Sequence, residues 1–216
     1  MQTRHLRERL RLEKMMGVDA LPRGTSLERD LRRIEAEVKR CAKCRLHETR
    51  TQAVVARGDP RSPLMFIGEA PGREEDEQGI PFVGPAGRLL DLMVHAMGLD
   101  RDAVHITNII KCRPPNNREP RADEIEACFP YLERQIGLIG PRIICTLGRP
   151  ASNTLLGTSR AMGDLRGRWA SFRGIAVLPT YHPAYLLRSP GQKKRAWEDL
   201  KKLIVAIEQG PPEVLF

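Results

Sequence analysis

The chain has 216 residues, enough for one domain with a substantial core, and its 41% hydrophobic and 29% charged residues are ordinary for a globular protein. No apolar run approaches the roughly 18 residues that a membrane span needs, and no secretory signal follows Met1, so we expect a cytoplasmic protein. We also expect it to be a monomer. The formal net charge of +9 favours a polyanionic partner without proving one, because Lys and Arg displace counterions when they bind phosphates.

The first forty residues form a basic segment, with eleven Lys or Arg against seven Asp or Glu. Apolar residues recur at helical spacing over 27–38, which predicts an amphipathic helix that ends just before Cys41. Gly and Pro residues within 17–24 separate this helix from an earlier basic one. We therefore expect a basic, helical N-terminal extension over residues 1–40, followed by one domain over residues 41–216.

Beyond residue 62, short apolar runs rich in β-branched residues alternate with longer helical patterns. This alternation predicts an α/β fold, a three-layer αβα sandwich with a central four-stranded parallel sheet covered by helices on both faces. Parallel sheets place ligands at the carboxyl ends of their strands, and three of those ends carry polar or charged residues, at 68–72, 108–113 and 181–188. The predicted strands lie in the runs PLMFIG, AVHITNII, RIICTLG and IAVLPT.

Four of the five cysteines can be grouped into one metal site. Cys41 and Cys44 form a C-x-x-C pair, while Cys112 follows a predicted strand and Cys128 lies in a predicted helix. Two close thiolates and two remote ones suit zinc or an iron–sulfur cluster alike, and the spacing does not choose between them. A thioredoxin-type redox pair is the alternative, but no apolar strand precedes Cys41. Cys145 lies within an apolar strand and is expected to be a small buried hydrophobic residue.

The loop after the first predicted strand combines five glycines with a run of carboxylates. Its glycines allow tight turns and close approach to a ligand. A phosphate-binding loop is not favoured, because the Lys of the G-x-x-x-x-G-K-[ST] pattern is missing and Glu69 and the acidic run 74–77 would repel phosphate. Phe82 offers a flat apolar face before the next helix. Taken alone, the loop also suits a solvated acidic turn with Phe82 in the core.

Two later loops carry groups suited to nucleic acid. Asn108 ends the second predicted strand, and its amide complements the imide edge of a pyrimidine, although a lone Asn is more often a turn residue. The last loop places His182 before apolar and basic residues, a combination that suits a wedge entering a duplex while cations hold the backbone. A lone His there would more often be structural. The candidate DNA contacts in these loops are Arg113, Arg118, Tyr185, Leu186 and Arg188.

Together, these segments resemble the family-four uracil-DNA glycosylases, the thermostable bacterial and archaeal type that carries a 4Fe-4S cluster. The resemblance rests on CAKC, GEAPGREEDEQGIPFVGPAG, TNIIKCRPPNNREP, the Cys128 helix, RIICTLG and TYHPAYLLR, which follow one another in the family order. It implies the uracil-DNA glycosylase fold and a monofunctional enzyme that flips uracil out of DNA and hydrolyses its N-glycosidic bond. The product would be an abasic site for base excision repair, and the partner uracil-containing DNA at the nucleoid.

The resemblance also assigns two sets of residues. The cluster ligands would be the four cysteines already grouped, which favours iron over zinc: Cys41, Cys44, Cys112 and Cys128. The uracil pocket would be lined by Glu69, Ala70, Glu75, Phe82, Asn108 and His182.

Within that pocket, the resemblance gives each side chain a role. Phe82 would stack on the flipped base, Asn108 would hydrogen-bond its imide edge, and Glu75 would crowd the place of a thymine methyl. His182 would stabilise the departing uracil anion, while Glu69 would position water or stabilise the cationic sugar. The family-one enzymes carry an Asp where this motif has Ala70, so the group that activates water stays open.

Two other functions are compatible with parts of this pattern. A related subgroup traps the abasic sugar covalently with a histidine on a basic insertion, but it has a GEQPG-type motif, whereas this chain has GEAPG and no such insertion. A non-catalytic DNA-binding or replication-associated module would keep the fold and the cluster. The intact pocket residues argue against that module.

Overall fold

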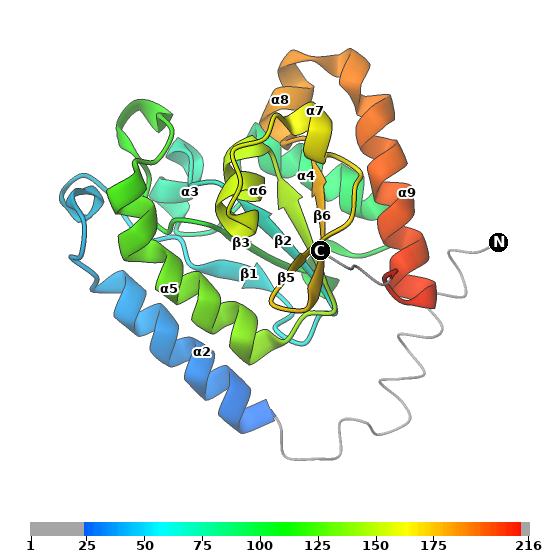
Figure 1. Ribbon diagram of the computed structural model, residues 1–216. Helices are drawn as coiled ribbons and strands as arrows, with labels where there is room; N and C mark the ends of the chain where they lie inside the picture. Colours follow the sequence, from blue (N-terminus) through cyan, green and yellow to red (C-terminus); the bar gives the residue numbers. More distant parts are fainter. Residues whose placement is uncertain (1–23, 213–216) are drawn as a thin grey trace.

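The computed structural model describes residues 24–212, and a six-stranded mixed sheet forms their centre (Figure 1). The strand order is β1-β3-β2-β4-β6-β5, in which the four inner strands are parallel and the two outer strands pair antiparallel with their neighbours. The strands are β1 (Ala56–Gly58), β2 (Leu64–Gly68), β3 (His105–Asn108), β4 (Ile143–Leu147), β5 (Ala170–Phe172) and β6 (Ile175–Thr180).

The four inner strands are those that the apolar runs predict, so the α/β fold with a parallel centre is confirmed. The predicted four-stranded parallel sheet forms the centre of a larger sheet, because the antiparallel strands β1 and β5, which were not predicted, extend it at its two edges. Each edge strand is three residues long and half-buried, and neither has the continuous apolar run that marks a buried strand. The inner strands are buried along almost their whole length.

Helices cover both faces of the sheet and complete three layers (Figure 1). On one face, α4 and α9 pack in a core that includes Phe66, Leu90 and Leu200. On the other face, α5 and α6 pack around Ile67 and Ile136. The α-helices are α2 (Gly24–Lys39), α3 (Arg73–Gln78), α4 (Pro85–Ala96), α5 (Ala122–Ile139), α6 (Arg149–Leu156), α7 (Met162–Leu165), α8 (Pro183–Arg188) and α9 (Lys193–Gln209). The short 3-10 helices are η2 (Arg45–Glu48), η3 (Arg101–Ala103), η4 (Pro115–Asn117) and η5 (Pro190–Gln192).

Helix α2 lies alongside α5 on the outside of the sandwich (Figure 1). Ile34 and Val38 are each 1% exposed and pack against Ala53, Val55 and Tyr131. The predicted amphipathic helix is thus confirmed, and it packs on the domain. The earlier basic helix expected before it lies outside the described residues. Over the described part of the chain, no helix has both the length and the apolarity needed to cross a membrane.

Backbone hydrogen bonds beyond the strands join the carboxyl ends of two pairs of parallel strands, β2 with β3 and β4 with β6. The N–H of Ile109 donates to the carbonyl of Gly68 at 2.8 Å, and the N–H of Ile110 donates to the carbonyl of Glu69 at 3.1 Å. At the neighbouring pair, the N–H of Gly148 donates to the carbonyl of Thr180 at 2.8 Å. These bonds hold the loops after β2, β3, β4 and β6 in fixed positions at one edge of the sheet.

Candidate active site

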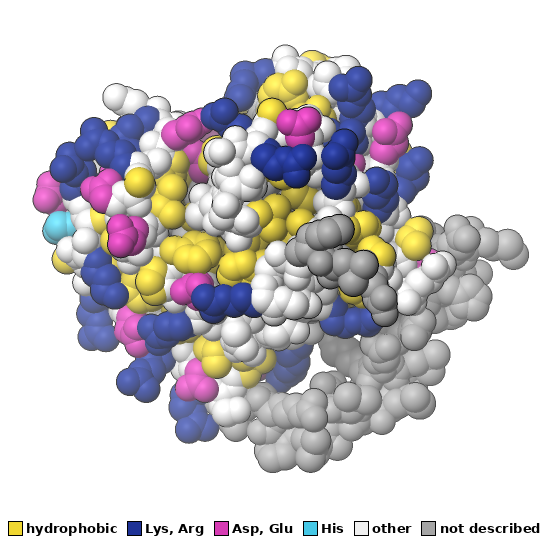
Figure 2. All heavy atoms as spheres, in the orientation of Figure 1, with side chains coloured by type: hydrophobic (Ala, Val, Ile, Leu, Met, Phe, Trp, Pro, Cys, Tyr) yellow, Lys and Arg dark blue, Asp and Glu magenta, His cyan; other side chains and the backbone are white. Residues whose placement is uncertain are grey.

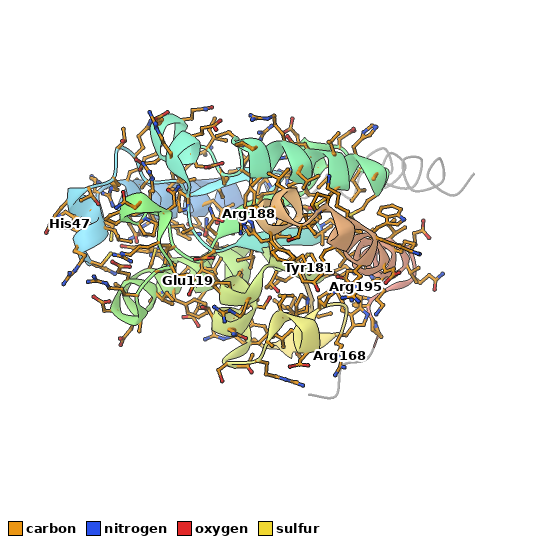
Figure 3. The ribbon with its side chains drawn as sticks, turned by 90° about the horizontal axis from the view of Figure 1, so that it is seen from above. His47, Glu119, Arg168, Tyr181, Arg188 and Arg195 are labelled. Atoms are coloured by element: carbon orange, nitrogen blue, oxygen red, sulfur yellow. The ribbon has the colours of Figure 1, made fainter. Side chains whose placement is uncertain are left out.

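A cavity of about 750 Å³ opens at this carboxyl edge of the sheet. Figure 3 views the molecule from above and labels three of the lining residues, Glu119, Tyr181 and Arg188. The structure brings all six predicted pocket residues to the wall of this one cavity, which is lined by Glu69, Ala70, Glu75, Phe82, Asn108 and His182.

Asn108 is the last residue of β3, and its side chain is almost fully buried, with 2% exposed. Its amide oxygen Oδ1 has no hydrogen-bond partner among the described residues, which leaves a buried acceptor for a bound molecule. The ring of Phe82 packs beside it, against the end of β2. A Cβ atom on Gly68 would lie 2.5 Å from Phe82 Cζ and would also overlap Asn108 Oδ1. The pocket therefore requires a glycine at position 68.

Glu75 fixes the shape of the acidic loop. Its Oε2 accepts a hydrogen bond from the N–H of Gly72 at 3.1 Å, and its Oε1 accepts from the N–H groups of Val83 and Gly84, each at 2.9 Å. Three backbone donors thus hold one carboxylate at the cavity wall. Since Phe82 directly precedes Val83, this arrangement also restrains the backbone next to Phe82.

Glu69 follows β2 directly and is half-buried at the cavity wall. Its pKa is raised to about 7, chiefly by burial and then by the carboxylate of Glu119, while the Arg149 guanidinium acts in the opposite direction. Glu119 and Arg149 also line the cavity and form an ion pair of 3.2 Å. Glu69 can therefore change its charge near neutral pH, the range in which general bases work.

His182 caps the N-terminus of α8 with its side chain. The ring nitrogen Nδ1 accepts a hydrogen bond from the N–H of Ala184 at 3.1 Å. Burial, with a smaller effect of the Arg188 guanidinium, lowers the pKa of His182 to about 4, so the imidazole is neutral at physiological pH. Because Nδ1 acts as an acceptor, the ring proton belongs on Nε2. The ring stacks on Phe82 with centroids 5.7 Å apart, which places a neutral N–H donor in the pocket.

Three of the five predicted DNA contacts, Arg118, Tyr185 and Arg188, line the cavity. Arg118 is held by the buried carboxylate of Glu124 through hydrogen bonds of 2.5 and 2.8 Å. Arg113 lies outside the cavity wall but is partly exposed on the same loop. Figure 2 shows further Lys and Arg side chains, in dark blue, gathered over α8 and the start of α9.

The prediction that Leu186, the fifth residue of that set, contacts DNA disagrees with the structure. This side chain is 1% exposed and packs in the hydrophobic core beneath α8. The helical phase explains this, because Pro183 and Leu186 are three residues apart and face inward together. The next residue, Leu187, is 43% exposed and is the apolar side chain available at this surface.

The four grouped cysteines line a second, small cavity between the end of α2, η2 and α5: Cys41, Cys44, Cys112 and Cys128. Two of the sulfur atoms accept hydrogen bonds, from Arg50 Nη1 to Cys112 Sγ at 3.1 Å and from the N–H of Lys111 to Cys128 Sγ at 3.3 Å. Within residues 24–212, no group of three or more His, Cys, Asp or Glu side chains is arranged to hold a metal ion. Cys145 is fully buried in β4, as predicted.

Several residues of the cavity wall were not singled out from the sequence. Glu119 and Tyr181 lie within motif segments, but no pattern indicates that their side chains point into the cavity. Arg149 is the first residue of α6 and comes soon after β4, the third parallel strand along the chain. That position could have indicated a residue of the site, because ligands bind at the carboxyl ends of parallel strands. Met162 comes from α7, a segment without any motif, and only the folded chain places it at this site.

The comparisons with known proteins agree with this geometry. A family model described as the uracil DNA glycosylase superfamily matches residues 55–201. Over 185 residues, the chain is 48% identical to the type-4 uracil-DNA glycosylase of Sulfurisphaera tokodaii, covering 80% of this chain and 83% of that protein. The chain belongs to the type-4 uracil-DNA glycosylase family. The region of this chain that the superfamily model matches runs from β1 into α9 and contains all the predicted pocket residues.

A second type-4 relative, from Saccharolobus solfataricus, is 46% identical over 187 residues, which cover 82% of this chain and 87% of that protein. A type-5 uracil-DNA glycosylase from Thermus thermophilus is 32% identical over 147 residues, covering 61% of this chain and 65% of that protein. The two type-4 relatives have higher identity and coverage than the type-5 relative, in agreement with membership of the type-4 family.

Proposed function

We propose that this protein removes uracil from DNA by hydrolysing its N-glycosidic bond and leaves an abasic site for base excision repair. The observation that carries the proposal is the buried amide of Asn108: its Oδ1 has no partner among the described residues, and the residue lines a cavity large enough for a base. A module that only bound DNA would need no such buried acceptor. We place the enzyme in the cytosol, at the DNA of the nucleoid, acting as a monomer.

Recognition of uracil follows from the pocket side chains. The imide N3–H would donate to Asn108 Oδ1, and the O4 atom would accept from Asn108 Nδ2, whereas cytosine presents the opposite donor and acceptor pattern. Phe82 would stack on the base. Glu75, held by three backbone N–H groups, cannot move aside easily and would crowd the methyl group of thymine.

The chemistry requires stabilisation of a departing uracil anion and a cationic, oxocarbenium-like sugar. His182, neutral and protonated on Nε2, would donate to uracil O2, and a preorganised donor of this kind contributes on the order of 3 kcal/mol. Glu69, in its carboxylate form, would position the attacking water and stabilise the sugar cation. Among the described residues that line the cavity there is no Lys, which supports a monofunctional enzyme.

Binding of the DNA strand would use the cations around the cavity. Arg118 and Arg188 line it, and Arg113 stands on the adjoining loop. Each would neutralise a backbone phosphate, and the net charge of +9 agrees with such contacts.

The four cysteines are proposed to hold a 4Fe-4S cluster. They line one cavity, and the hydrogen bonds from Arg50 and Lys111 to sulfur suit thiolate ligands. Four thiolates suit zinc and a 4Fe-4S cluster alike, and the resemblance to the family-four enzymes, to which the relatives belong, favours the iron–sulfur cluster. The cluster would supply no chemistry to excision. It would join the end of α2 and helix α5 to the segment that follows Asn108.

The activity is tested with pure protein and a uracil-containing oligonucleotide, followed by alkali, which cleaves the strand at abasic sites. Strand cleavage at the uracil position is expected, and none with an oligonucleotide carrying thymine there. If the protein with an intact cluster produced no cleavage, the non-catalytic DNA-binding module would be the better description.

Purified protein is expected to be brown, with an absorption band at about 400 nm that reports thiolate-bound iron. Cys112→Ser is expected to lose this band, because it removes one ligand, while Cys145→Ser retains it as a matched control in β4. Spectra and iron content of both variants check the prediction. A colourless wild-type protein containing zinc would contradict it.

The pH dependence of excision is expected to follow Glu69. Its raised pKa of about 7 means that the carboxylate forms as the pH rises through this value, so kcat/KM should rise with pH to a plateau above about pH 8. Glu119→Gln removes a negative charge, lowers the pKa of Glu69 and should move the midpoint to lower pH. Arg149→Gln should move it to higher pH. Profiles that coincide for all three proteins would exclude Glu69 as the titrating group.

A further inference from the structure

Two tyrosines stand side by side at the wall of the cavity, apart from the residues that would hold uracil. Tyr181 follows β6 directly, and Tyr185 lies one turn further on, in α8. Their ring centroids are 5.0 Å apart with an interplanar angle of 36°. Both rings are partly exposed and line the cavity. They form an aromatic surface that the recognition of the flipped base does not use.

A cation lies over the ring of Tyr181. The guanidinium of Arg166 lies 5.5 Å from the centroid of the Tyr181 ring. Arg166 donates to both carboxylate oxygens of Asp199, at 2.6 and 3.1 Å, and Asp199 also accepts from Thr180 Oγ1 at 2.7 Å. Asp199 is 1% exposed, so this ion pair is part of the folded core. A ring held in this way loses little freedom when another flat group stacks on it.

Cations lie next to the tyrosine pair. Arg188 lines the cavity with both rings, and its side chain is exposed. Arg195 is exposed, and its backbone carbonyl accepts a hydrogen bond from Arg166 Nη2 at 2.6 Å, so its backbone lies beside the guanidinium that contacts the Tyr181 ring. Figure 3 shows Tyr181 between Arg188 and Arg195. A flat aromatic surface beside exposed cations is the combination that binds an unpaired nucleotide, through base stacking and phosphate contacts.

We propose that Tyr181 and Tyr185 form a stacking subsite for the nucleobase next to the flipped uridine, with Arg188 and Arg195 contacting phosphates of the same strand. The subsite rests on the proposed function and adds a second base contact to it. Leu186 is buried and unavailable to the neighbouring base, whereas both tyrosine rings are partly exposed at the cavity wall. The ligand class is any nucleobase, because every base offers a flat face.

The test changes the DNA and the protein separately. Three fluorescent single-stranded oligonucleotides carry 2′-fluoro-2′-deoxyuridine, whose fluorine disfavours the sugar cation and slows cleavage. One has all its bases, one lacks the base on the 5′ side of the uridine, and one lacks the base on the 3′ side. Dissociation constants are measured by anisotropy for the wild type, Tyr185→Leu and Tyr185→Phe.

The wild type is expected to bind one of the two abasic-neighbour oligonucleotides about tenfold more weakly than the complete one. Tyr185→Leu is expected to bind the complete oligonucleotide about tenfold more weakly and to show no further loss with the abasic neighbour. Tyr185→Phe keeps the ring and should match the wild type.

Equal binding of all three oligonucleotides by the wild type would overturn the subsite. So would a Tyr185→Leu variant that still lost tenfold on removal of the neighbouring base. The binding measurement does not depend on excision. The alkali assay with ordinary uracil tests the proposed activity separately, so the failure of one proposal can be told from the failure of the other.

Discussion

Replacing His182 by alanine is expected to lower the single-turnover excision rate by about 10²- to 10³-fold while changing DNA affinity little. The ring is neutral, its Nδ1 is occupied by the N–H of Ala184, and its Nε2–H is thus available to the developing uracil anion. That donation matters most in the transition state, so the loss should fall on the rate rather than on binding. Rapid-quench excision assays at saturating protein, with anisotropy for affinity, measure the two effects. Asn108→Ala is expected to follow the same pattern.

The side chain of His182 also caps α8, so a loss of folding stability must be separated from a loss of catalysis. Removing an N-cap costs about 1 kcal/mol, which a thermal unfolding curve detects. His182→Asn is the matched control, because Asn is a good N-cap but its shorter side chain does not reach the place of Nε2. It should recover the Tm of the wild type and not its rate. Wild-type excision by His182→Ala would show that the assigned role is wrong.

The parallel centre of the sheet could be predicted because its strands are buried on both faces. Runs such as LMFIG and IICTL are apolar at nearly every position, and that composition marks a buried parallel strand. The edge strands ARG and ASF have no such signal, since their pairing uses backbone groups that every residue has. Their partners are set by the tertiary fold, which the local sequence does not encode.

In the candidate site, too, some features could be predicted from the sequence and others depend on the tertiary fold. Asn108 and Glu69 stand at the ends of predicted strands, and the resemblance to the family-four enzymes named them as pocket residues. The charge of Glu69 could not, because it depends on Glu119 and Arg149, which only the fold brings near it. The error at Leu186 arose because a motif fixes the order of residues and not the phase of the short helix that carries them.

Gly68→Ala is expected to reduce excision by at least about 100-fold, although it adds only a methyl group. The new Cβ would lie 2.5 Å from Phe82 Cζ and would overlap Asn108 Oδ1, so the stacking ring and the base-contacting amide would both have to move. Both side chains are buried in a close-packed interior, so moving them costs free energy of folding. Overpacking of this kind destabilises by about 1–3 kcal/mol, and displacing a binding group by about 1 Å can reduce the rate about 100-fold.

Gly163→Ala provides the matched control, because Gly163 lines the same cavity and a Cβ there would have no atom within 4 Å. This variant is expected to keep excision within about twofold of the wild type and to unfold at the same temperature or slightly higher, since Ala favours the helix over Gly. Excision rates and Tm values of the two alanine variants separate close approach at Gly68 from a general effect of glycine replacement. Wild-type activity in Gly68→Ala would mean that Asn108 and Phe82 need not approach β2 so closely, and the pocket geometry that supports uracil recognition would then need revision.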